Sequence, residues 1–218
     1  REQVWTLYKD VMKQILDTFS EGTNNVRMDS NFLLWQSQEG AALTWMDAII
    51  DGEPVTRRNG YAVELNALWF NAVMFYRELA TLACQDGETA RWDEFAAEFP
   101  EHFKQTFWSK EKGYLADCVY GMKKDFSVRC NMIFAVSMPY TCLSLKIRQL
   151  IVEKVKQELL TPYGLRTLSP TSADYHPQYR GSQPERDRAY HNGTVWAWLI
   201  GAFAEAYLNV YGSNAVNY

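Results

Sequence analysis

Helical spacing of apolar residues, broken by three long stretches that lack it, most constrains how this chain can fold. From residue 4 to residue 19 apolar side chains recur every three or four positions, which predicts an amphipathic helix that stops at residues 20–22. From residue 63 to about residue 83 they are dense enough to predict a helix buried on most sides. The same spacing predicts four further helices, over residues 90–107, 131–137, 144–160 and 188–211.

The stretches between these helices cover residues 24–62, 109–130 and 161–187. They are much longer than ordinary connections of about 4–6 residues, so we expect them to carry function. Short strand-like pieces are expected inside them, at residues 32–34 and 114–116. An α/α toroid, in which helix hairpins stack in a ring and the long loops gather at one end, fits this alternation. A solenoid or an irregular bundle fits the number of helices as well.

The composition favours a sugar ligand over a nucleic acid. The 218 residues fit one domain, or a large piece of a bigger one, and 47% of them are hydrophobic. Aromatic residues reach 15%, and polar-edged aromatic rings in excess are typical of a sugar-binding cleft as well as of a core. The net charge of −4 argues against a nucleic-acid surface, which would need a basic patch.

The cysteine and histidine patterns predict neither a metal nor another cofactor. The four cysteines have no C-x-x-C spacing, so we expect reduced, mostly buried thiols and no disulfide scaffold. The three histidines lack the spacing of metal ligands. No apolar run is long enough to span a membrane and no signal peptide is visible, so we expect a cytoplasmic protein. The chain does not begin with Met, so a leader could have been removed.

Two motifs far apart in the sequence combine an acid with aromatic residues. The run LTWMD ends at Asp47, and the run YHNGTVW covers residues 190–196. Sugar chemistry needs an acid beside an aromatic surface, and these motifs supply both. The chain has no G-x-S-x-G elbow, no phosphate loop and no G-x-G-x-x-G after a strand, so acyl transfer, nucleotide hydrolysis and hydride transfer lack sequence support.

Several runs together carry a family resemblance. They are LTWMD at 43–47, PVTRR at 54–58, VELNALWFNA at 63–72, IFAVS at 133–137, LTPYGLRTLSP at 160–170, RD at 186–187 and YHNGTVW at 190–196. In this order they resemble the amylo-α-1,6-glucosidase domain of glycogen debranching enzymes over nearly the whole chain. The departures are Arg57 for a usual proline, Cys130 and Met132 for a usual proline and glutamine, and Asn192 for a usual glutamine.

The resemblance implies an all-α (α/α)6 barrel, with residues 1–218 as a single partial domain that is incomplete at both ends. It also implies inverting hydrolysis of α-1,6-linked glucose in an α-glucan such as glycogen or limit dextrin. Asp47 matches the family's proton donor, a role that burial beside Trp45 and Met46 would favour. On the residues alone, Asp47 is favoured to cap or bridge a loop.

Inversion also requires a carboxylate that activates water, about 6.5–9.5 Å from the acid. The family's base resembles a glutamate on a later loop, beyond Tyr218. The local candidates Glu64, Glu185 and Asp187 do not match it. We therefore expect a fragment with little or no activity alone, whose exposed flank could self-associate. A non-hydrolytic relative that binds α-glucan or a protein, and another (α/α)6 hydrolase such as a trehalase-like or rhamnosidase-like enzyme, remain alternatives.

Eight residues are candidates for binding substrate, and each has a structural alternative. Trp45 and Trp196 are expected to form a sugar platform, and His191, placed at a helix start, is expected to contact sugar. Glu64 and Asn66 lie at the start of a helix that is otherwise apolar. Buried polar groups must be paired, so these two bind either a sugar hydroxyl or a loop backbone. Arg57 could clamp hydroxyls or a carboxylate, or else lie solvated on the surface. The rigid fork of Arg166 suits contact with Asp47, Glu64 or adjacent diols, or else a structural salt bridge. The remaining candidate is Asp187.

Overall fold

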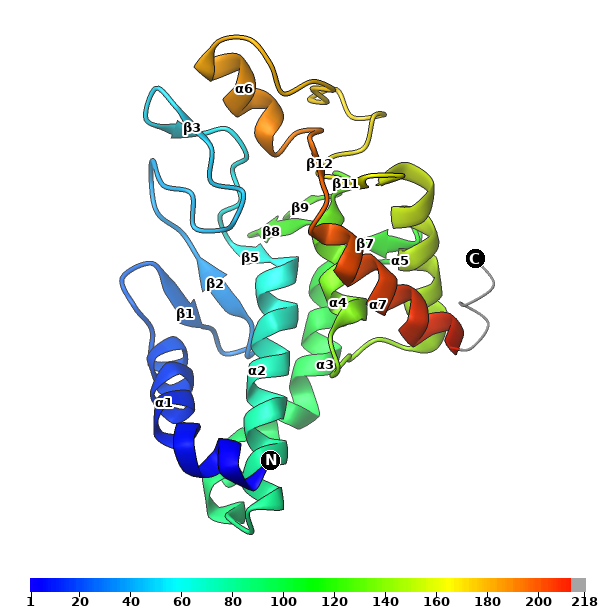
Figure 1. Ribbon diagram of the computed structural model, residues 1–218. Coiled ribbons are helices and arrows are strands. Elements are labelled where there is room, and N and C mark those ends of the chain that lie inside the picture. Colours follow the sequence, from blue (N-terminus) through cyan, green and yellow to red (C-terminus); the bar gives the residue numbers. More distant parts are fainter. Residues whose placement is uncertain (213–218) are drawn as a thin grey trace.

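The structure is a computed structural model that describes residues 1–212 (Figure 1). In this part of the chain seven α-helices form the framework and three short 3-10 helices extend it. The α-helices are α1 (Glu2–Glu21), α2 (Val63–Leu82), α3 (Asp93–Phe107), α4 (Phe134–Ser137), α5 (Leu145–Glu158), α6 (Gln183–Tyr190) and α7 (Leu199–Tyr211). The 3-10 helices are η1 (Asp86–Glu88), η2 (Ala90–Trp92) and η3 (Cys130–Ile133).

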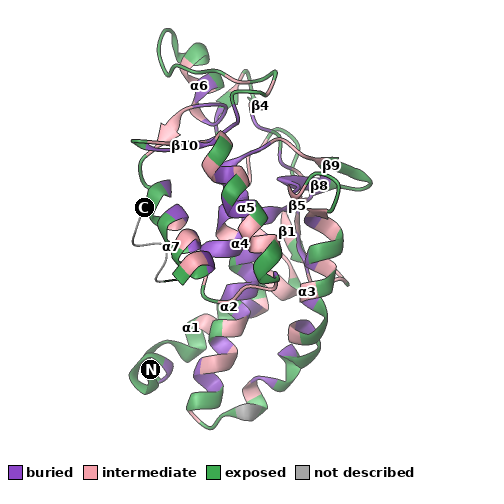
Figure 2. Cartoon of the chain, turned by 90° about the vertical axis from the view of Figure 1, so that its right-hand side faces the viewer, coloured by how far each residue is buried: buried purple, intermediate pink, exposed green. Residues whose placement is uncertain are grey.

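Helix α2 is the centre of the packing. It contacts α1, α3 and α4, and α7 in turn packs on α4 and α5. Figure 2 shows buried residues gathered where α2, α4 and α7 meet, whereas the outward faces of α1 and α3 are exposed. Helix α3 faces α2 with a single aromatic stripe, because its phenylalanines recur every fourth residue. That stripe consists of Phe95, Phe99, Phe103 and Phe107, all buried.

Five small antiparallel sheets lie in the long loops. The two-stranded ones pair β1 (Val26–Met28) with β2 (Leu34–Gln36), β3 (Ile49–Ile50) with β4 (Glu53–Pro54), and β6 (Trp108–Ser109) with β7 (Tyr114–Leu115). The three-stranded ones join β5 (Tyr61–Ala62), β8 (Cys118–Tyr120) and β9 (Lys123–Asp125), and β10 (Leu160–Thr161), β11 (Gly164–Arg166) and β12 (Val195–Trp196). Figure 1 shows β3, β8, β9, β11, β12 and α6 in the half of the molecule away from the N-terminus.

Most of the predicted helices are confirmed to within a few residues, because dense or periodic apolar patterns mark them. The chain is helix-dominated as predicted, but the five sheets mean that "all-α" describes the framework and not the loops. The strand expected at residues 114–116 is β7. The one expected at 32–34 begins later, at Leu34, because Phe32 turns the chain with a φ of 64°.

The predicted helix over residues 188–211 is wrong. Helix α6 ends at Tyr190, strand β12 intervenes, and α7 begins only at Leu199. Gly193 separates the two helices: its φ is 146°, and a Cβ there would lie 2.3 Å from the carbonyl oxygen of His176. His191 therefore lies after a helix and not at a helix start. Helix α6 begins inside the predicted loop, where Ser182 and Glu185 form a capping box.

Two further expectations concern thiols and membranes. All four cysteines are free, as predicted; Cys118 and Cys130 are buried and Cys142 is half-buried, whereas Cys84 is exposed. Within residues 1–212, no helix combines the length and the apolar character that a membrane span needs.

Candidate active site

The segment that carries Asp47 is held by its methionine. Burial alternates from Met46 to Ile49, as in an extended chain that leads into β3. Met46 is fully buried, and its sulfur lies 3.5 Å from Nδ2 of Asn131 and 3.9 Å from Nη1 of Arg129. Because Met46 turns into the core, Asp47 turns out to solvent. Asp47 therefore lacks the burial beside Trp45 and Met46 that would favour a proton-donor role.

An aromatic wall stands beside this segment. The indole of Trp45 meets the rings of His191 and Trp198 edge-on, each with 5.2 Å between ring centroids. His191 is in turn stacked on Trp196 at 6.4 Å. The two sequence motifs, predicted to act together, therefore do come together through Trp45 and His191. Trp198, half-exposed and two residues past the second motif, was missed because nothing in the sequence distinguishes it from a core tryptophan.

A buried network of ion pairs and hydrogen bonds holds Trp45 from the interior of the protein. Arg58 donates two hydrogen bonds to Glu64, at 2.5 and 2.6 Å, and its Nε donates to Asp117 at 2.7 Å. The other oxygen of Asp117 accepts from Asn131 Nδ2 at 2.7 Å, and Asn131 Oδ1 accepts from the Trp45 indole N–H at 2.8 Å. An unbroken chain of hydrogen bonds thus runs from the first turn of α2 to the aromatic wall.

Local backbone geometry lets the network form. Gly60 has a φ of 96°, and a Cβ there would lie 2.1 Å from the carbonyl oxygen of Val119. Only glycine permits so close an approach of this segment to β8. The approach brings Arg58 beside Asp117, whose carbonyl oxygen also accepts from the N–H of Val63 at the start of α2.

The two arginines of the network differ in how well their charge is balanced. Burial acts to lower the pKa of Arg58, but the attraction of Asp117 and Glu64 outweighs it and raises this pKa well above its usual value. Burial lowers the pKa of Arg129, with Asp117 opposing only in part. Arg129 donates mainly to neutral groups, the carbonyl oxygen of His191 at 2.6 Å and Oδ1 of Asn192 at 2.8 Å.

His191 is held neutral by its surroundings. Burial is the main cause that lowers its pKa from 6.5 to about 4; Asp47 acts in the opposite direction, and Arg129 and Arg58 add to the lowering. The Nδ1 atom of His191 is buried and has no hydrogen-bond partner among the described residues.

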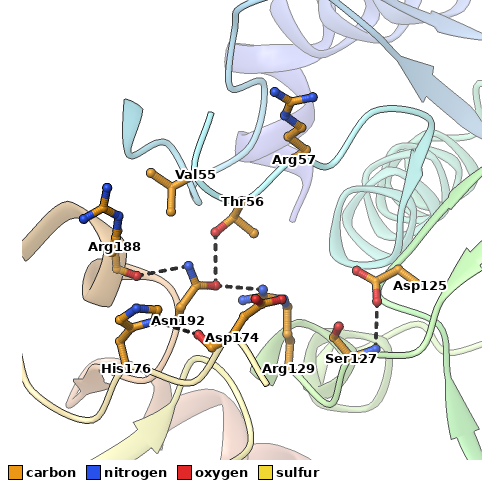
Figure 3. Close-up of a pocket in the computed structure, with 10 residues that line it drawn as sticks. All are labelled: Val55, Thr56, Arg57, Asp125, Ser127, Arg129, Asp174, His176, Arg188 and Asn192. Atoms are coloured by element: carbon orange, nitrogen blue, oxygen red, sulfur yellow. Dashed lines mark hydrogen bonds between the residues drawn. The ribbon is translucent and has the colours of Figure 1, made fainter. Parts of the chain in front are cut away.

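A polar pocket of about 360 Å³ opens on the other side of Arg129 (Figure 3). Asn192 lies at its centre: Oδ1 accepts from Arg129 at 2.8 Å and from the Thr56 hydroxyl at 3.4 Å, and Nδ2 donates to the carbonyl oxygen of Arg188 at 3.0 Å. Charged side chains from Arg57, Asp125, Asp174 and Arg188 complete much of the lining. Asp47 is not among the residues that line this pocket.

The other predicted binding residues lie in several places. Asn66 is fully buried and uses its amide on the backbone of Leu34 and Ala62, so of its two expected roles the structure gives it the loop-backbone one. Arg57 is exposed, lines the pocket and pairs with Glu53 at 2.9 Å. Arg166 does not contact Asp47 or Glu64; its Nε donates to the Tyr175 hydroxyl at 3.1 Å.

The three local candidates for a water-activating carboxylate are all engaged. Both oxygens of Glu64 accept from Arg58, and its side chain is 2% exposed. Glu185 closes the capping box of α6, and Asp187 accepts from Gln183 at 2.7 Å. Within the described residues, none of the three makes a hydrogen bond or ion pair with a residue of the aromatic wall.

Sequence reasoning missed Asp117, Arg129 and Asn131, which join the two motifs. Their roles depend on partners 59 to 86 residues away, such as Arg58 for Asp117 and Trp45 for Asn131. A pattern read along one chain carries no signal for such pairs.

The fold is similar to that of known glycosidases. A sialidase structure superposes with a TM-score of 0.71 and 12% identity, over 98% of this chain and 18% of the sialidase chain. A GH63 mannosylglycerate hydrolase from Thermus thermophilus gives a TM-score of 0.53 and 18% identity, over 72% of this chain and 35% of the other. At such identities the likeness concerns the fold alone.

The sequence profile of amylo-alpha-1,6-glucosidase matches residues 2–218, and the chain belongs to this family. The glycogen debranching enzyme of Saccharomyces cerevisiae is 24% identical, over 75% of this chain and 13% of the yeast protein. The chain thus corresponds to a small part of that relative's length. The resemblance indicated by the sequence motifs is confirmed.

Breaking the buried network should cost much stability. In Arg58→Met, Glu64 and Asp117 lose their partner while still buried, so we expect the free energy of unfolding to fall by about 3–5 kcal/mol. The neighbouring Arg57→Met is the matched control: it removes only an exposed pair and should cost less than about 1 kcal/mol. Urea unfolding of both variants measures the difference, and equal losses would refute the assigned role of the network.

The neutral state of His191 predicts a pH dependence of stability. The folded pKa lies near 4 and the ordinary value is 6.5, so between these values the unfolded chain binds the additional proton. The free energy of unfolding should therefore fall as pH drops from about 6.5 to about 4, and less so in His191→Gln. NMR titration of the imidazole should show a midpoint near 4. A midpoint near 6.5 would contradict the burial of this ring.

Proposed function

We propose that this chain is the part of an α-1,6-glucosidase of the debranching type that supplies the general acid. The substrate is glucose α-1,6-linked at a branch point of glycogen or limit dextrin, and hydrolysis inverts the anomeric carbon. Asp47 is the acid. The observation that carries the proposal is the position of Asp47: it is exposed next to the aromatic wall, on a segment locked by buried Met46.

The geometry suits this chemistry. A glucosyl unit packed on the aromatic wall would present its glycosidic oxygen to the exposed carboxyl of Asp47. Trp45 and Trp196 serve as the platform, and the buried, neutral ring of His191 packs against both of them without adding charge. Trp45 is held by Asn131, so the wall is preorganised before substrate binds.

The remaining predicted residues take supporting roles in the proposal. Glu64 holds Arg58, and Asn66 holds the loop at Leu34, so both position the site from behind. Arg57 is exposed at the pocket and can reach a sugar hydroxyl. Arg166 orients Tyr175 through its hydrogen bond, and Asp187 stabilises α6 by accepting from Gln183. Both residues act on the substrate mainly through these neighbours.

The water-activating base is proposed to come from outside these 218 residues, since Glu64, Glu185 and Asp187 are engaged. The same additional segments would complete the (α/α)6 barrel. The engaged carboxylates equally favour a second candidate, a non-hydrolytic α-glucan-binding relative. Glucose release by a longer protein that carries this chain separates the two candidates.

One flank of the chain fits this account. The outer face of α1 exposes Leu7, Tyr8, Val11 and Ile15, an apolar stripe at helical spacing. We propose that further helices of the barrel cover it, and that in the isolated chain it self-associates. Elution of the isolated chain as a monomer over a wide concentration range would count against self-association. A cytoplasmic location is proposed because the thiols are free.

Replacing the acid tests the proposal. In the longest protein that contains this chain, Asp47→Asn should lower glucose release from a branched maltooligosaccharide about 10²–10⁴-fold, because proton donation to the leaving oxygen is lost. NMR should show β-glucose as the first product of the wild type. The isolated chain should bind the substrate and release little or no glucose.

The matched control is Asp51→Asn, four residues further on at the tip of the β3–β4 hairpin. Asp51 is exposed with a φ of 52°, a conformation that asparagine tolerates. This variant should keep wild-type glucose release. Full activity in Asp47→Asn, or equal losses in both variants, would remove Asp47 from the role of acid.

A further inference from the structure

Four dipeptides in the chain join an asparagine or an aspartate to a glycine. In such a dipeptide the glycine nitrogen can attack the preceding side chain, because glycine adds no side chain that would hinder the approach. Asparagine reacts faster than aspartate in an unstructured peptide, so the sequence alone ranks the two Asn-Gly dipeptides as the more reactive. The four are Asp51–Gly52, Asn59–Gly60, Asp86–Gly87 and Asn192–Gly193.

The fold protects both Asn-Gly dipeptides, because the nitrogen that would attack is already hydrogen-bonded. The N–H of Gly60 donates to the carbonyl oxygen of Gln36 at 2.6 Å. The N–H of Gly193 donates to the Thr167 hydroxyl at 2.8 Å. Asn192 is also 5% exposed, and both polar atoms of its side-chain amide are hydrogen-bonded. The structure therefore reverses the ranking that the sequence suggests.

The two Asp-Gly dipeptides have different backbones. Asp86–Gly87 lies inside the 3-10 helix η1, which holds its backbone in helical geometry. Asp51–Gly52 instead forms the two-residue loop of the β3–β4 hairpin, between the paired residues Ile50 and Glu53. The φ of Asp51 is 52°, a left-handed conformation that an L-residue adopts at a cost.

The groups that would react at the hairpin tip are unoccupied. Asp51 and Gly52 are both exposed, and a Cβ added at Gly52 would meet nothing within 4 Å. In the part of the chain that the structure describes, neither the N–H of Gly52 nor the carboxylate of Asp51 has a hydrogen-bond partner. The two strands form only two residue pairs, and so short a hairpin is marginally stable by itself. Its tip can therefore open and rotate into the reactive geometry.

The reaction at this tip needs no reagent except water. The nitrogen of Gly52 attacks Cγ of Asp51 in its acid form, and the new C–N bond closes a succinimide ring. The N–H proton leaves with the carboxyl hydroxyl as water. Water then adds to one of the two imide carbonyls. Cleavage at Cγ restores aspartate, whereas cleavage at the main-chain carbonyl carbon leaves isoaspartate, in which the backbone runs through the former side chain.

Isoaspartate at this position disturbs the segment that carries Asp47. The backbone becomes one atom longer in a loop whose length fits the strand register, so the β3–β4 pairing loosens. That pairing continues to the N–H of Val55, which donates to the carbonyl oxygen of Ala48 at 2.9 Å. Ala48 directly follows Asp47, and helix α6 packs on β3 (Figure 1). The hairpin thus supports the Asp47 segment after this residue, as buried Met46 supports it before.

We propose that Asp51–Gly52 is a site of spontaneous isomerisation to isoaspartate, and that the product loosens the β3–β4 hairpin beside Asp47. The covalent change requires no activity of the chain. Its effect on turnover rests on the proposed function of Asp47.

The test incubates the longest protein that contains this chain for several weeks at neutral pH, folded and in urea. In the folded sample the tryptic peptide of residues 28–57 should appear in two forms of equal mass. An aspartate-specific protease should cut only the original form at residue 51. Asn59 and Asn192 should stay intact in the folded sample, whereas in urea both should deamidate faster than Asp51 isomerises.

Two variants serve as controls. Asp51→Gly should give no isoaspartate at this position, and glycine accepts the local φ of 52° without strain. Asp51→Asn should gain isoaspartate faster than the wild type, because its amide releases ammonia when the ring closes. Both variants should release glucose as the wild type does when freshly prepared, since Asp51 contacts no group of the proposed site.

The isoaspartyl form, separated by ion exchange, should show faster hydrogen exchange at the Val55 amide and lower glucose release than unmodified protein of the same age. Faster exchange at Val55 supports the inference whatever glucose release shows, so failure of the proposed function is a separate result. Three outcomes would overturn the inference: Asp51 intact in the folded protein but isomerised in urea, equal modification of Asn59 or Asn192 in the folded protein, or unchanged Val55 exchange in the isoaspartyl form.

Discussion

The buried pairing of Arg58 with Glu64 and Asp117 is the interaction on which the rest of the site depends. All three side chains are at most 2% exposed, so each charge is tolerable only because the others are present. Glu64 stands in the first turn of α2, where the helix dipole also favours a carboxylate. The network therefore ties the central helix of the fold to the loop between β4 and β5 and to the start of β8.

Hydrogen bonds connect this buried network to the surface segment that carries Asp47. Asp117 holds Asn131, Asn131 holds Trp45, and Met46 is locked beneath them, so exposed Asp47 is presented by a rigid support. The charged groups of this network stay in the interior, and aromatic rings stand between them and the proposed ligand. This division suits recognition of a sugar, whose hydroxyls and C–H faces need hydrogen bonds and ring surfaces more than net charge.

The helical framework could be predicted from sequence because apolar periodicity is a local signal. The prediction failed between α6 and α7. There Gly193 separates the two helices in close approach to His176, 17 residues earlier, and the capping box at Ser182 was overlooked. Asp47, Trp45 and His191 could be proposed from the sequence because their motifs are local. Asp117 and Arg129 were not, because a buried ion network exists only once distant segments have packed. Asp47 is not buried beside its apolar neighbours, since the alternation of an extended chain sends Met46 inward and Asp47 outward.

The central claim is that Asp47 and the aromatic wall hold one glucosyl unit between them. The most direct measurement is a crystal structure of the longest protein containing this chain, carrying Asp47→Asn, with a branched maltooligosaccharide bound. The account predicts the α-1,6 glycosidic oxygen within about 2.6–3.2 Å of the residue-47 side chain, with the glucose ring packed on Trp45. A branch point bound elsewhere, with residue 47 facing only solvent, would contradict it.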